Sequence, residues 1–334
     1  YNKLNSTEYS GNPASSQDPA FQRIATADFG AKDIHNWIIE PQAEYSKKFG
    51  KRKINILLGG TFEQDINSST IISGSGYSND NLITSIAGAP DKTAIDAYSP
   101  YKYNAVFGRV NYQFNQRYIL NLNGRRDGSS RFGPGKQFGN FGSIGAAWIF
   151  SEEKPIKSNL PFLSYGKLRA SYGTTGNAAI GDYQYISRWQ PTDYYYQGSP
   201  GYLPQNLFNP DFSWAVTKKA EGAIELGFLK DRLLLSALYF RNRSGNQLVF
   251  YQLPSQTGFL NVTENSPATV QNSGWEFTIT SSNFKSKSFT WNTSFNLTFP
   301  RNKLVSFPGI ESSSYATKYI VGQSLNVIKG FKYL

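Results

Sequence analysis

The sequence predicts an all-β fold, an antiparallel transmembrane β-barrel, and three observations support this prediction. Within residues 288–299, one strand face would carry Trp291, Phe295, Leu297 and Phe299, while Asn, Ser and Thr side chains would occupy the opposite face. Short turns and long loops alternate regularly along the chain. Aromatic residues are abundant, although the chain is only moderately hydrophobic. These features together are typical of a barrel wall between lipid and water.

The composition favours a β-protein with a polar interior. The 334 residues are 39% hydrophobic yet 16% aromatic, with 22 Tyr and 24 Phe. Outer-membrane barrels carry aromatic girdles at both membrane interfaces, and a wet interior needs polar side chains. Disordered chains are poor in aromatic residues, so the composition argues against disorder. No apolar run reaches the roughly 18 residues that would indicate a transmembrane helix.

Charge and rare residue types exclude several kinds of chemistry. The net charge is +11, but the densest cationic run, residues 47–53, lies at an expected turn. No nucleic-acid-recognition fold frames this run, so we interpret it as a solvated turn and expect no nucleic-acid partner. The chain has no Cys and a single His, His35. We therefore expect no cofactor and no metal site built from Cys or clustered His.

Alternating side-chain patterns predict about eleven strands. Residues 1–32 are polar, and we expect a loop there with a short helix near 19–25. The expected strands, in chain order, are 33–49, 53–67, 106–114, 118–125, 138–150, 165–172, 214–228, 232–250, 274–284, 288–299 and 318–327.

The connections between these strands alternate strictly in length. The short turns are expected at 50–52, 115–117, 151–164, 229–231 and 285–287, with a helical turn from Ser151 in the third. The long loops are expected at 68–101, 126–136, 173–213, 251–269 and 301–317. In outer-membrane barrels, short turns face the periplasm and long loops face the outside. Many strands exceed the 9–11 residues that cross a bilayer, so we expect them to extend above it.

The alternation also assigns side chains to the two sides of the wall. Arg109, Asn123 and Arg125 fall at alternate positions that would be costly against lipid, so we expect them in a wet lumen as candidate substrate contacts. The opposite assignment applies to the last hairpin, where the expected lipid-facing residues are Trp291, Phe295, Leu297 and Phe299.

The loop at 173–213 is the second candidate substrate site because it concentrates aromatic residues, namely Trp189, Tyr194, Tyr195, Tyr196 and Tyr202. Exposed aromatic rings beside amides and carboxylates can stack on sugars or clamp peptides. The alternative is that these rings pack the loop on itself or on a partner, since large ordered loops need small cores of their own. The basic, Gly-rich loop at 126–136 lacks Walker spacing and a following helix, so we expect no phosphate cradle there.

Several short motifs occur together in one order along residues 50–330. They are Phe107-Gly108-Arg109-Val110-Asn111-Tyr112, Arg125-Arg126-Asp127-Gly128-Ser129-Ser130-Arg131-Phe132-Gly133, Lys167-Leu168-Arg169-Ala170-Ser171-Tyr172-Gly173-Thr174-Thr175-Gly176-Asn177, Asn209-Pro210-Asp211-Phe212-Ser213-Trp214, Leu253-Pro254-Ser255-Gln256-Thr257-Gly258-Phe259, Asn272-Ser273-Gly274-Trp275-Glu276-Phe277 and Gly322-Gln323-Ser324-Leu325. In this order and spacing, the chain resembles the SusC/RagA family of TonB-dependent outer-membrane transporters from the Bacteroidetes.

This resemblance implies that residues 1–334 are part of a larger, 22-stranded barrel domain that encloses a plug. It also implies import of glycans, oligosaccharides or peptides with a SusD-like surface lipoprotein as a lid and TonB as the energy source. The family is not enzymatic, and the carboxylates of this chain lie mostly in turns and loops without His support. We expect an internal piece of a longer precursor, because the chain opens on Tyr1 and carries no plug or TonB box. The alternative function is a passive porin or a structural, adhesive outer-membrane protein, which would have no plug.

Overall fold

The computed structural model describes residues 1–328 and 330, apart from the side chains of Asp193 and Tyr195, and is nearly all β. Within these residues the main sheet has twelve antiparallel strands. They are β1 (Asn2–Asn12), β2 (Thr26–Ile39), β3 (Gln42–Phe49), β4 (Arg52–Ser75), β5 (Asp91–Phe114), β6 (Tyr118–Ser129), β7 (Phe138–Trp148), β8 (Leu163–Asn177), β11 (Ala215–Phe228), β12 (Leu233–Gly245), β15 (Thr269–Lys285) and β16 (Thr290–Ser306). One short α-helix, α1 (Lys154–Asn159), lies between β7 and β8, directly after a 3-10 turn at Phe150–Glu152.

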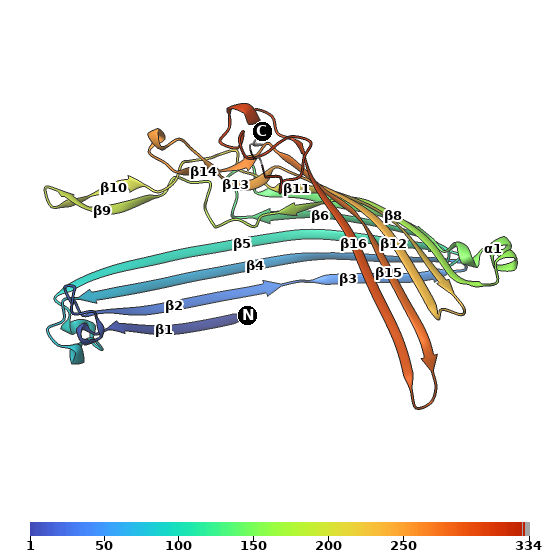
Figure 1. Cartoon of the computed structure of the whole chain (residues 1–334), viewed down its shortest axis with the longest axis horizontal. Helices are drawn as coiled ribbons and strands as arrows, with labels where there is room; N and C mark the ends of the chain where they lie inside the picture. Colours follow the sequence, from blue (N-terminus) through green and yellow to red (C-terminus); the bar gives the residue numbers. More distant parts are fainter. Residues whose placement is uncertain (329, 331–334) are drawn as a thin grey trace. The chain divides into compact units, whose positions relative to one another are not determined.

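The strand order of the sheet follows the chain. It runs β1-β2-β4-β5-β6-β7-β8-β11-β12-β15-β16, and β3 pairs with β4 (Figure 1). Two separate hairpins are inserted in the long loops: β9 (Trp189–Tyr196) with β10 (Ser199–Pro204), and β13 (Gln247–Gln252) with β14 (Asn261–Ser266). The predicted antiparallel, all-β architecture is therefore confirmed.

The predicted alternation of short turns and long loops is confirmed, and local backbone geometry explains the tight turns. Asn115 and Gln116 have φ values of 53° and 56°, and Leu229, Lys230 and Asp231 have values of 56° to 62°. Such left-handed conformations reverse a strand within two or three residues. The longer connection at 149–162 contains α1, in agreement with the expected helical turn.

The prediction for residues 1–32 is wrong. Residues 2–12 form β1, which pairs with β2 from Asn2 opposite Asn36 to Asn12 opposite Thr26, and residues 19–25 are not helical. The polar sequence concealed this strand, because backbone pairing with a neighbour needs no apolar side chains. The expected single strand at 33–49 is divided into β2 and β3 at Pro41, which has no N–H to donate to the ladder.

Several strands are longer than predicted, and one predicted strand is absent. β4 and β5 each have 24 residues, so the loop expected at 68–101 shrinks to 76–90. Similarly, β8 extends to Asn177 and β16 to Ser306. The prediction of a strand at 318–327 is wrong, because these residues form turns and irregular backbone. The predicted total of eleven matches the strand path only because the missed β1 offsets this error.

The chain divides into two compact units. The first comprises residues 1–40 and 61–104. Its small core contains Ala27, Tyr77, Ile83 and Ala89 beneath the loops at 13–25 and 76–90. The two loops are also joined by Asp80, whose carboxylate accepts hydrogen bonds from the N–H groups of Ala14 and Ser15 at 2.8 and 3.1 Å. A hydrogen bond from the Ser15 side chain, followed by those from the two N–H groups, holds the pKa of Asp80 below its ordinary value.

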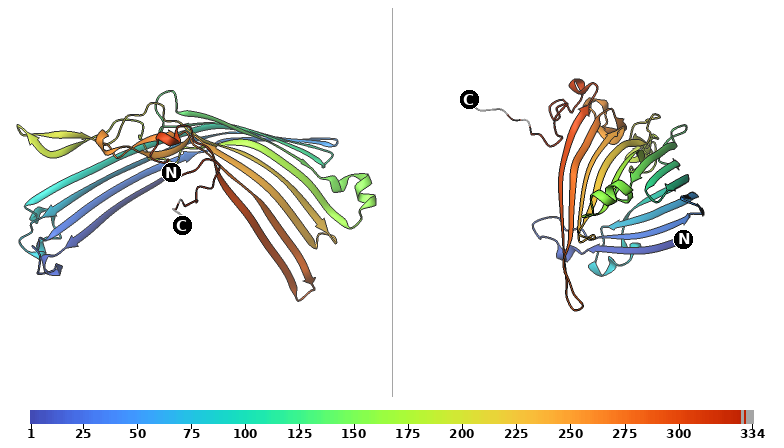
Figure 2. Two further views of the ribbon diagram at one scale, coloured as in Figure 1. Left: turned by 45° about the horizontal axis from the view of Figure 1, so that its top comes forward. Right: turned by 90° about the vertical axis from the view of Figure 1, so that its right-hand side faces the viewer.

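The second unit comprises residues 41–60 and 105–334, and it carries an aromatic core within its long loops. Phe132 packs against Phe212 and Trp214 with ring centroids 5.6 and 5.0 Å apart, and Trp214 also contacts Phe141. The Trp214 indole donates to the carbonyl of Gln137 at 3.0 Å. In this unit, the yellow-to-red strands from β11 to β16 lie side by side in chain order (Figure 2). The aromatic core packs the loops at 130–137 and 178–214 against each other and against β7.

Replacing Phe212 with Ala should loosen this core, because removal of a buried aromatic ring costs about 3–5 kcal/mol. Limited proteolysis of the full-length parent protein should then cleave the loops at 130–137 and 178–214 faster. Phe208→Ala is the matched control, since the Phe208 side chain is 61% exposed whereas Phe212 is 0% exposed. Equal cleavage rates for the two variants would contradict this role for Phe212.

Candidate functional site

The strand register of the second unit separates two chemically different faces. We call the side of β16 that carries Trp291, Phe295, Leu297 and Phe299 the apolar face, and the side that carries Asn292, Ser294, Asn296 and Thr298 the polar face. The apolar face extends over the neighbouring strands, because paired residues share one face of a sheet. Leu297 lies opposite Phe277, and Phe277 lies opposite Ala237. The apolar face continues through Ile224 and Leu168 to Trp148.

The polar face contains a cavity of about 420 Å³ between β5, β6, β7 and β8. Its lining includes Phe107, Arg109, Asn123, Arg125, Asp127 and Phe141. The structure thus brings together the three lumen residues that the alternation pattern selected, Arg109, Asn123 and Arg125. Cationic, amide and aromatic groups at one site can bind carboxylates, hydroxyls and ring faces.

Hydrogen bonds and packing fix most of the cavity lining. Asn123 donates its amide N–H to the Ser143 hydroxyl at 3.0 Å. The Arg125 guanidinium pairs with the buried carboxylate of Asp127 and lies 5.3 Å from the centre of the Phe107 ring. A Cβ atom at Gly59 would come within 2.6 Å of that ring, so glycine leaves the space that Phe107 occupies. Arg109, by contrast, is exposed.

A network of ion pairs lies on the same face of β8 and β11. Arg169 contacts Glu221 and Glu225 at 2.9 Å each, and Lys167 contacts Glu225 at 3.2 Å. These side chains are only partly exposed, so their charges interact more strongly than surface pairs do. Glu225 of β11 lies directly opposite Lys167 of β8. The ion pairs therefore join β8 and β11 through side chains, in addition to the backbone hydrogen bonds between these strands.

The tyrosine-rich candidate site is separate from the cavity. Trp189, Tyr194, Tyr196 and Tyr202 belong to the β9–β10 hairpin and are 61%, 83%, 78% and 63% exposed. Tyr195 lies on β9 opposite Pro200, but its side chain is outside what the structure describes. The hairpin projects from the long-loop end of the second unit (Figure 1). These exposed rings are available to a ligand or partner.

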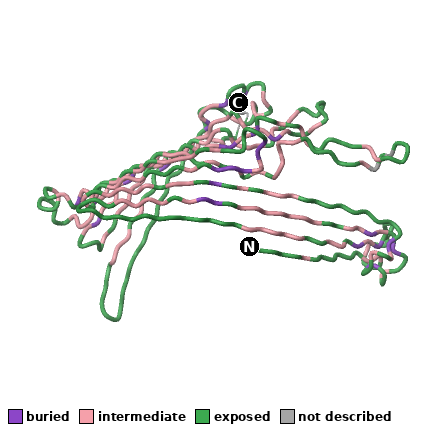
Figure 3. The backbone as a smooth tube through the Cα atoms, turned by 180° about the vertical axis from the view of Figure 1, so that it is seen from behind, coloured by how far each residue is buried: buried purple, intermediate pink, exposed green. Residues whose placement is uncertain are grey.

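The four residues expected to face lipid share one side of β16. Trp291, Phe295, Leu297 and Phe299 are exposed, as are most residues of β16 and of its turn to β15 (Figure 3). Among the described strands, β16 pairs only with β15, and its other edge is unpaired except at Leu304, whose N–H and carbonyl bond to Gln323 and Gly322 at 2.8 Å each.

Sequence reasoning missed the structural role of two motifs. The basic loop expected at 126–136 begins after Ser129 in the structure, and Asp127 and Ser129 are buried residues of β6. Phe132 is buried in the loop, and Arg131 binds Asp182 at 2.8 Å and the carbonyl of Ala178 at 3.0 Å. In the motif at 209–214, the Asn209 amide donates to the carbonyl of Thr263 at 2.8 Å. Both motifs therefore connect one loop to another. The mixture of Asn, Asp and aromatic residues in these loops is the sequence feature that could have predicted this structural role.

The short-turn end carries a different polar cluster around Glu153. Its carboxylate accepts hydrogen bonds from the Tyr118 hydroxyl at 2.7 Å, Trp148 Nε1 at 3.3 Å and Arg117 Nη1 at 3.0 Å. The Tyr118 hydrogen bond is the main cause that holds the pKa of Glu153 below its ordinary value. The carboxylate is thus ionised at neutral pH, and this part of its stabilisation is lost as the pH falls through the lowered pKa.

The described residues contain no group of three or more His, Cys, Asp or Glu side chains arranged to hold a metal ion. In the same part of the chain, no helix is both long and apolar enough to span a membrane.

Comparison with known proteins identifies a family of receptors. Residues 1–330 match the family described as TonB dependent receptor-like, beta-barrel. TonB-dependent receptor P39 of Formosa agariphila is 35% identical over 72% of this chain and 23% of its own length. TonB-dependent receptor SusC of Bacteroides thetaiotaomicron is 28% identical over 81% of this chain and 27% of its own length. The chain spans about a quarter of these curated relatives.

The fold is similar to that of a solved transporter. The RagAB peptide importer in its closed-closed state superimposes with a TM-score of 0.85 over 96% of this chain and 36% of that chain, at 22% identity. At this identity, the similarity concerns the fold alone.

Glu225→Gln should destabilise the wall, because it leaves Lys167 and Arg169 with one neutral partner in place of a carboxylate. We expect a loss of about 1–2 kcal/mol after allowance for partial solvent exposure, measured as a lower midpoint of thermal unfolding of the full-length parent protein in detergent. Glu276→Gln is the control, since Glu276 is an exposed carboxylate on the polar face. An equal midpoint in both variants would contradict a stabilising role for the network.

Proposed function

This chain belongs to the TonB-dependent receptor β-barrel family, and we propose that residues 1–334 form part of the barrel wall and outer loops of an active importer in the bacterial outer membrane. The match over residues 1–330 carries this proposal. The family consists of receptors and transporters, and the chain is not an enzyme. In this role, the polar face lines the lumen and the apolar face contacts lipid.

The dimensions of the apolar face support its contact with lipid. The stretch from Trp291 to Phe299 covers roughly 20–27 Å of membrane depth, depending on strand tilt. Outer-membrane barrels present an apolar band of about 25 Å between two aromatic girdles. Trp291 and Phe299 occupy the two ends of the stretch, as girdle residues do.

Glycans, oligosaccharides or peptides are the proposed substrates. SusC is a TonB-dependent receptor, and RagAB is a peptide importer, so the relatives support transport of a nutrient. The polar cavity adds donors at Arg109, Asn123 and Arg125 beside aromatic rings, and this combination suits both hydroxyl-rich and peptide ligands. The exposed rings of the β9–β10 hairpin would contact substrate or a SusD-like lipoprotein lid at the outer surface.

The remainder of the barrel and the energy source belong to the proposed parent protein. The free edge of β16 needs a neighbouring strand, because an unpaired edge is not tolerated in lipid. We infer that further strands complete the wall, that a plug occupies the lumen, and that TonB supplies energy from the inner membrane.

Uptake by the full-length parent, expressed with its neighbouring lipoprotein, tests this function across a panel of glycans and peptides. Arg109→Ala should raise the substrate concentration for half-maximal uptake about 5–10-fold, because a charged hydrogen bond contributes about 1.5 kcal/mol or more. Lys219→Ala is the control, since Lys219 is an exposed cation of the polar face that does not line the cavity. Equal shifts for both variants would exclude a specific role for the cavity.

The same assay distinguishes an active importer from a passive porin. Deletion of TonB, or collapse of the inner-membrane proton gradient, should abolish uptake by an importer. Unchanged uptake under these conditions would overturn the proposal and favour a porin.

Phe295→Arg tests the assignment of the apolar face. An arginine near the middle of the bilayer costs about 2–4 kcal/mol in a barrel wall, so the variant should insert poorly and unfold at lower denaturant concentration. Asn296→Arg, on the polar face of the same strand, should have little effect. Equal insertion of the two variants would show that Phe295 does not face lipid.

A further inference from the structure

Five cations lie together on the apolar face, directly beyond its aromatic end. The register places Tyr239 opposite Trp275 and Trp275 opposite Phe299, which gives one aromatic row across β12, β15 and β16. The next row on the same face, toward the long loops, contains Arg241, Ser273 and Arg301. The row after that contains Lys218, Arg243, Gln271 and Lys303. We call Lys218, Arg241, Arg243, Arg301 and Lys303 the cationic rim.

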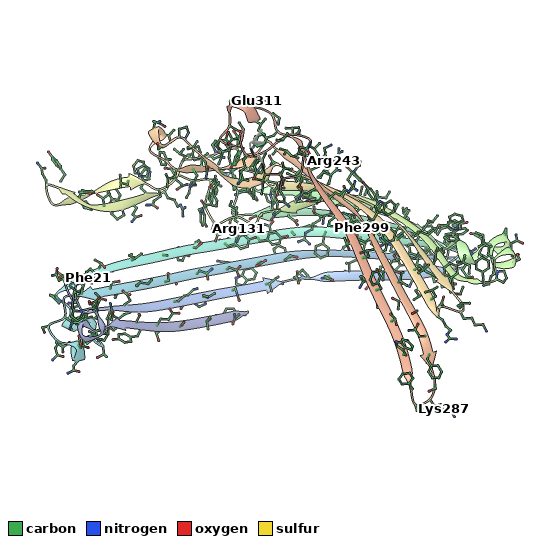
Figure 4. All side chains as sticks on the ribbon, in the orientation of Figure 1. Phe21, Arg131, Arg243, Lys287, Phe299 and Glu311 are labelled. Atoms are coloured by element: carbon green, nitrogen blue, oxygen red, sulfur yellow. The ribbon has the colours of Figure 1, made fainter. Side chains whose placement is uncertain are left out.

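The cationic rim is at the long-loop end of these strands. Arg243 is labelled near the loops, Lys287 at the opposite turn, and Phe299 between them (Figure 4). All five cations are exposed. Their positions mark the boundary where the apolar face changes from aromatic to charged side chains.

The cations of the rim have no carboxylate partner among the described residues. Arg243 donates to the amide oxygen of Gln271 at 2.8 Å, and the ion pairs of the second unit lie elsewhere. The cations of the polar face differ, because Arg125, Lys167 and Arg169 are each paired with Asp or Glu. Five neighbouring, unneutralised cations favour an anionic ligand supplied from outside the chain.

A depression joins the rim to the aromatic row. A cavity of about 620 Å³ is lined by Tyr239, Ser273, Trp275, Phe277, Phe299 and Arg301. Four of these residues are aromatic, and Arg301 is the charged residue of the lining. Arg241 and Arg301 are two strands apart in one row, or roughly 10 Å between backbones. A phosphate between them could accept hydrogen bonds from both guanidinium groups.

We propose that this surface is a binding site for a phosphorylated lipid of the outer leaflet. The phosphate binds the cationic rim, and the acyl chains lie along Tyr239, Trp275, Phe277 and Phe299 in the adjoining depression. The proposal rests on the proposed function, because that function places the apolar face in lipid and the long loops outside. A lipid fits this surface better than an acidic protein does, since the aromatic row continues into the membrane-facing wall.

The experiment uses the full-length parent protein in detergent, with monophosphoryl lipid A as the probe and native mass spectrometry as the readout. The double variant R241Q/R301Q should bind the lipid at least tenfold more weakly than the unsubstituted protein. The matched control is K285Q/K287Q, which removes the same charge at the short-turn end of the β15–β16 hairpin. Both double variants should retain the thermal unfolding midpoint of the parent, since all four side chains are exposed.

Three further measurements distinguish the possible ligands. A lipid with the same acyl chains but no phosphate should bind weakly, and millimolar inorganic phosphate should not displace the phosphorylated lipid. Equal binding by the phosphate-free lipid, displacement by inorganic phosphate, or equal binding by R241Q/R301Q and K285Q/K287Q would each overturn the proposal. Loss of lipoprotein association in R241Q/R301Q with unchanged lipid binding would instead identify a protein-docking surface. Substrate uptake by the unsubstituted protein tests the proposed import separately, because uptake can persist when lipid binding fails.

Discussion

Backbone hydrogen bonding is the constraint on which this structure depends. Lipid offers no partner to an N–H or a C=O group, so each strand of a membrane wall must pair with a neighbour along its length. The ladder meets this requirement from β1 to β16 in the order of the chain. It explains why polar residues 2–12 form a strand and why residues 91–105 do so without regular alternation. The free edge of β16 shows where the same requirement still calls for a partner.

Once the strands are paired, the alternation of side chains gives the sheet two chemically different faces. On one face, Trp275 and Phe299 continue an aromatic row, and Arg241 and Arg301 mark its outer boundary. On the other face, Arg169 and Glu225 neutralise each other, and Arg125 pairs with Asp127. Arg125, Lys167 and Arg169 on the polar face are thus paired within the protein, whereas the five cations of the rim have no carboxylate partner among the described residues. The same strands thereby carry both surfaces of our proposals, one for import and the other for lipid binding.

The loops follow a different principle, since no continuous ladder orders them. Their positions depend on the buried rings of Phe132, Phe212 and Trp214, and on amide side chains such as Asn209 that satisfy loop backbone groups. This core leaves the β9–β10 hairpin free to present its aromatic rings outward. Rigid loop bases beneath exposed aromatic rings are well suited to binding large ligands.

The sequence by itself determined the fold class, the alternation of turns and loops, and the faces of Phe295 and Arg109, because a period of two is a local property. Strand ends were less predictable, since β4 and β5 extend through polar residues that only a neighbour can order. The absent strand at 318–327 has the same cause: alternation without a partner does not make a strand. Only the tertiary structure joined Arg109, Asn123 and Arg125 in one cavity and aligned the five cations of the rim. Both sites arise from the register between neighbouring strands, and register is set by strand pairing rather than by any single segment.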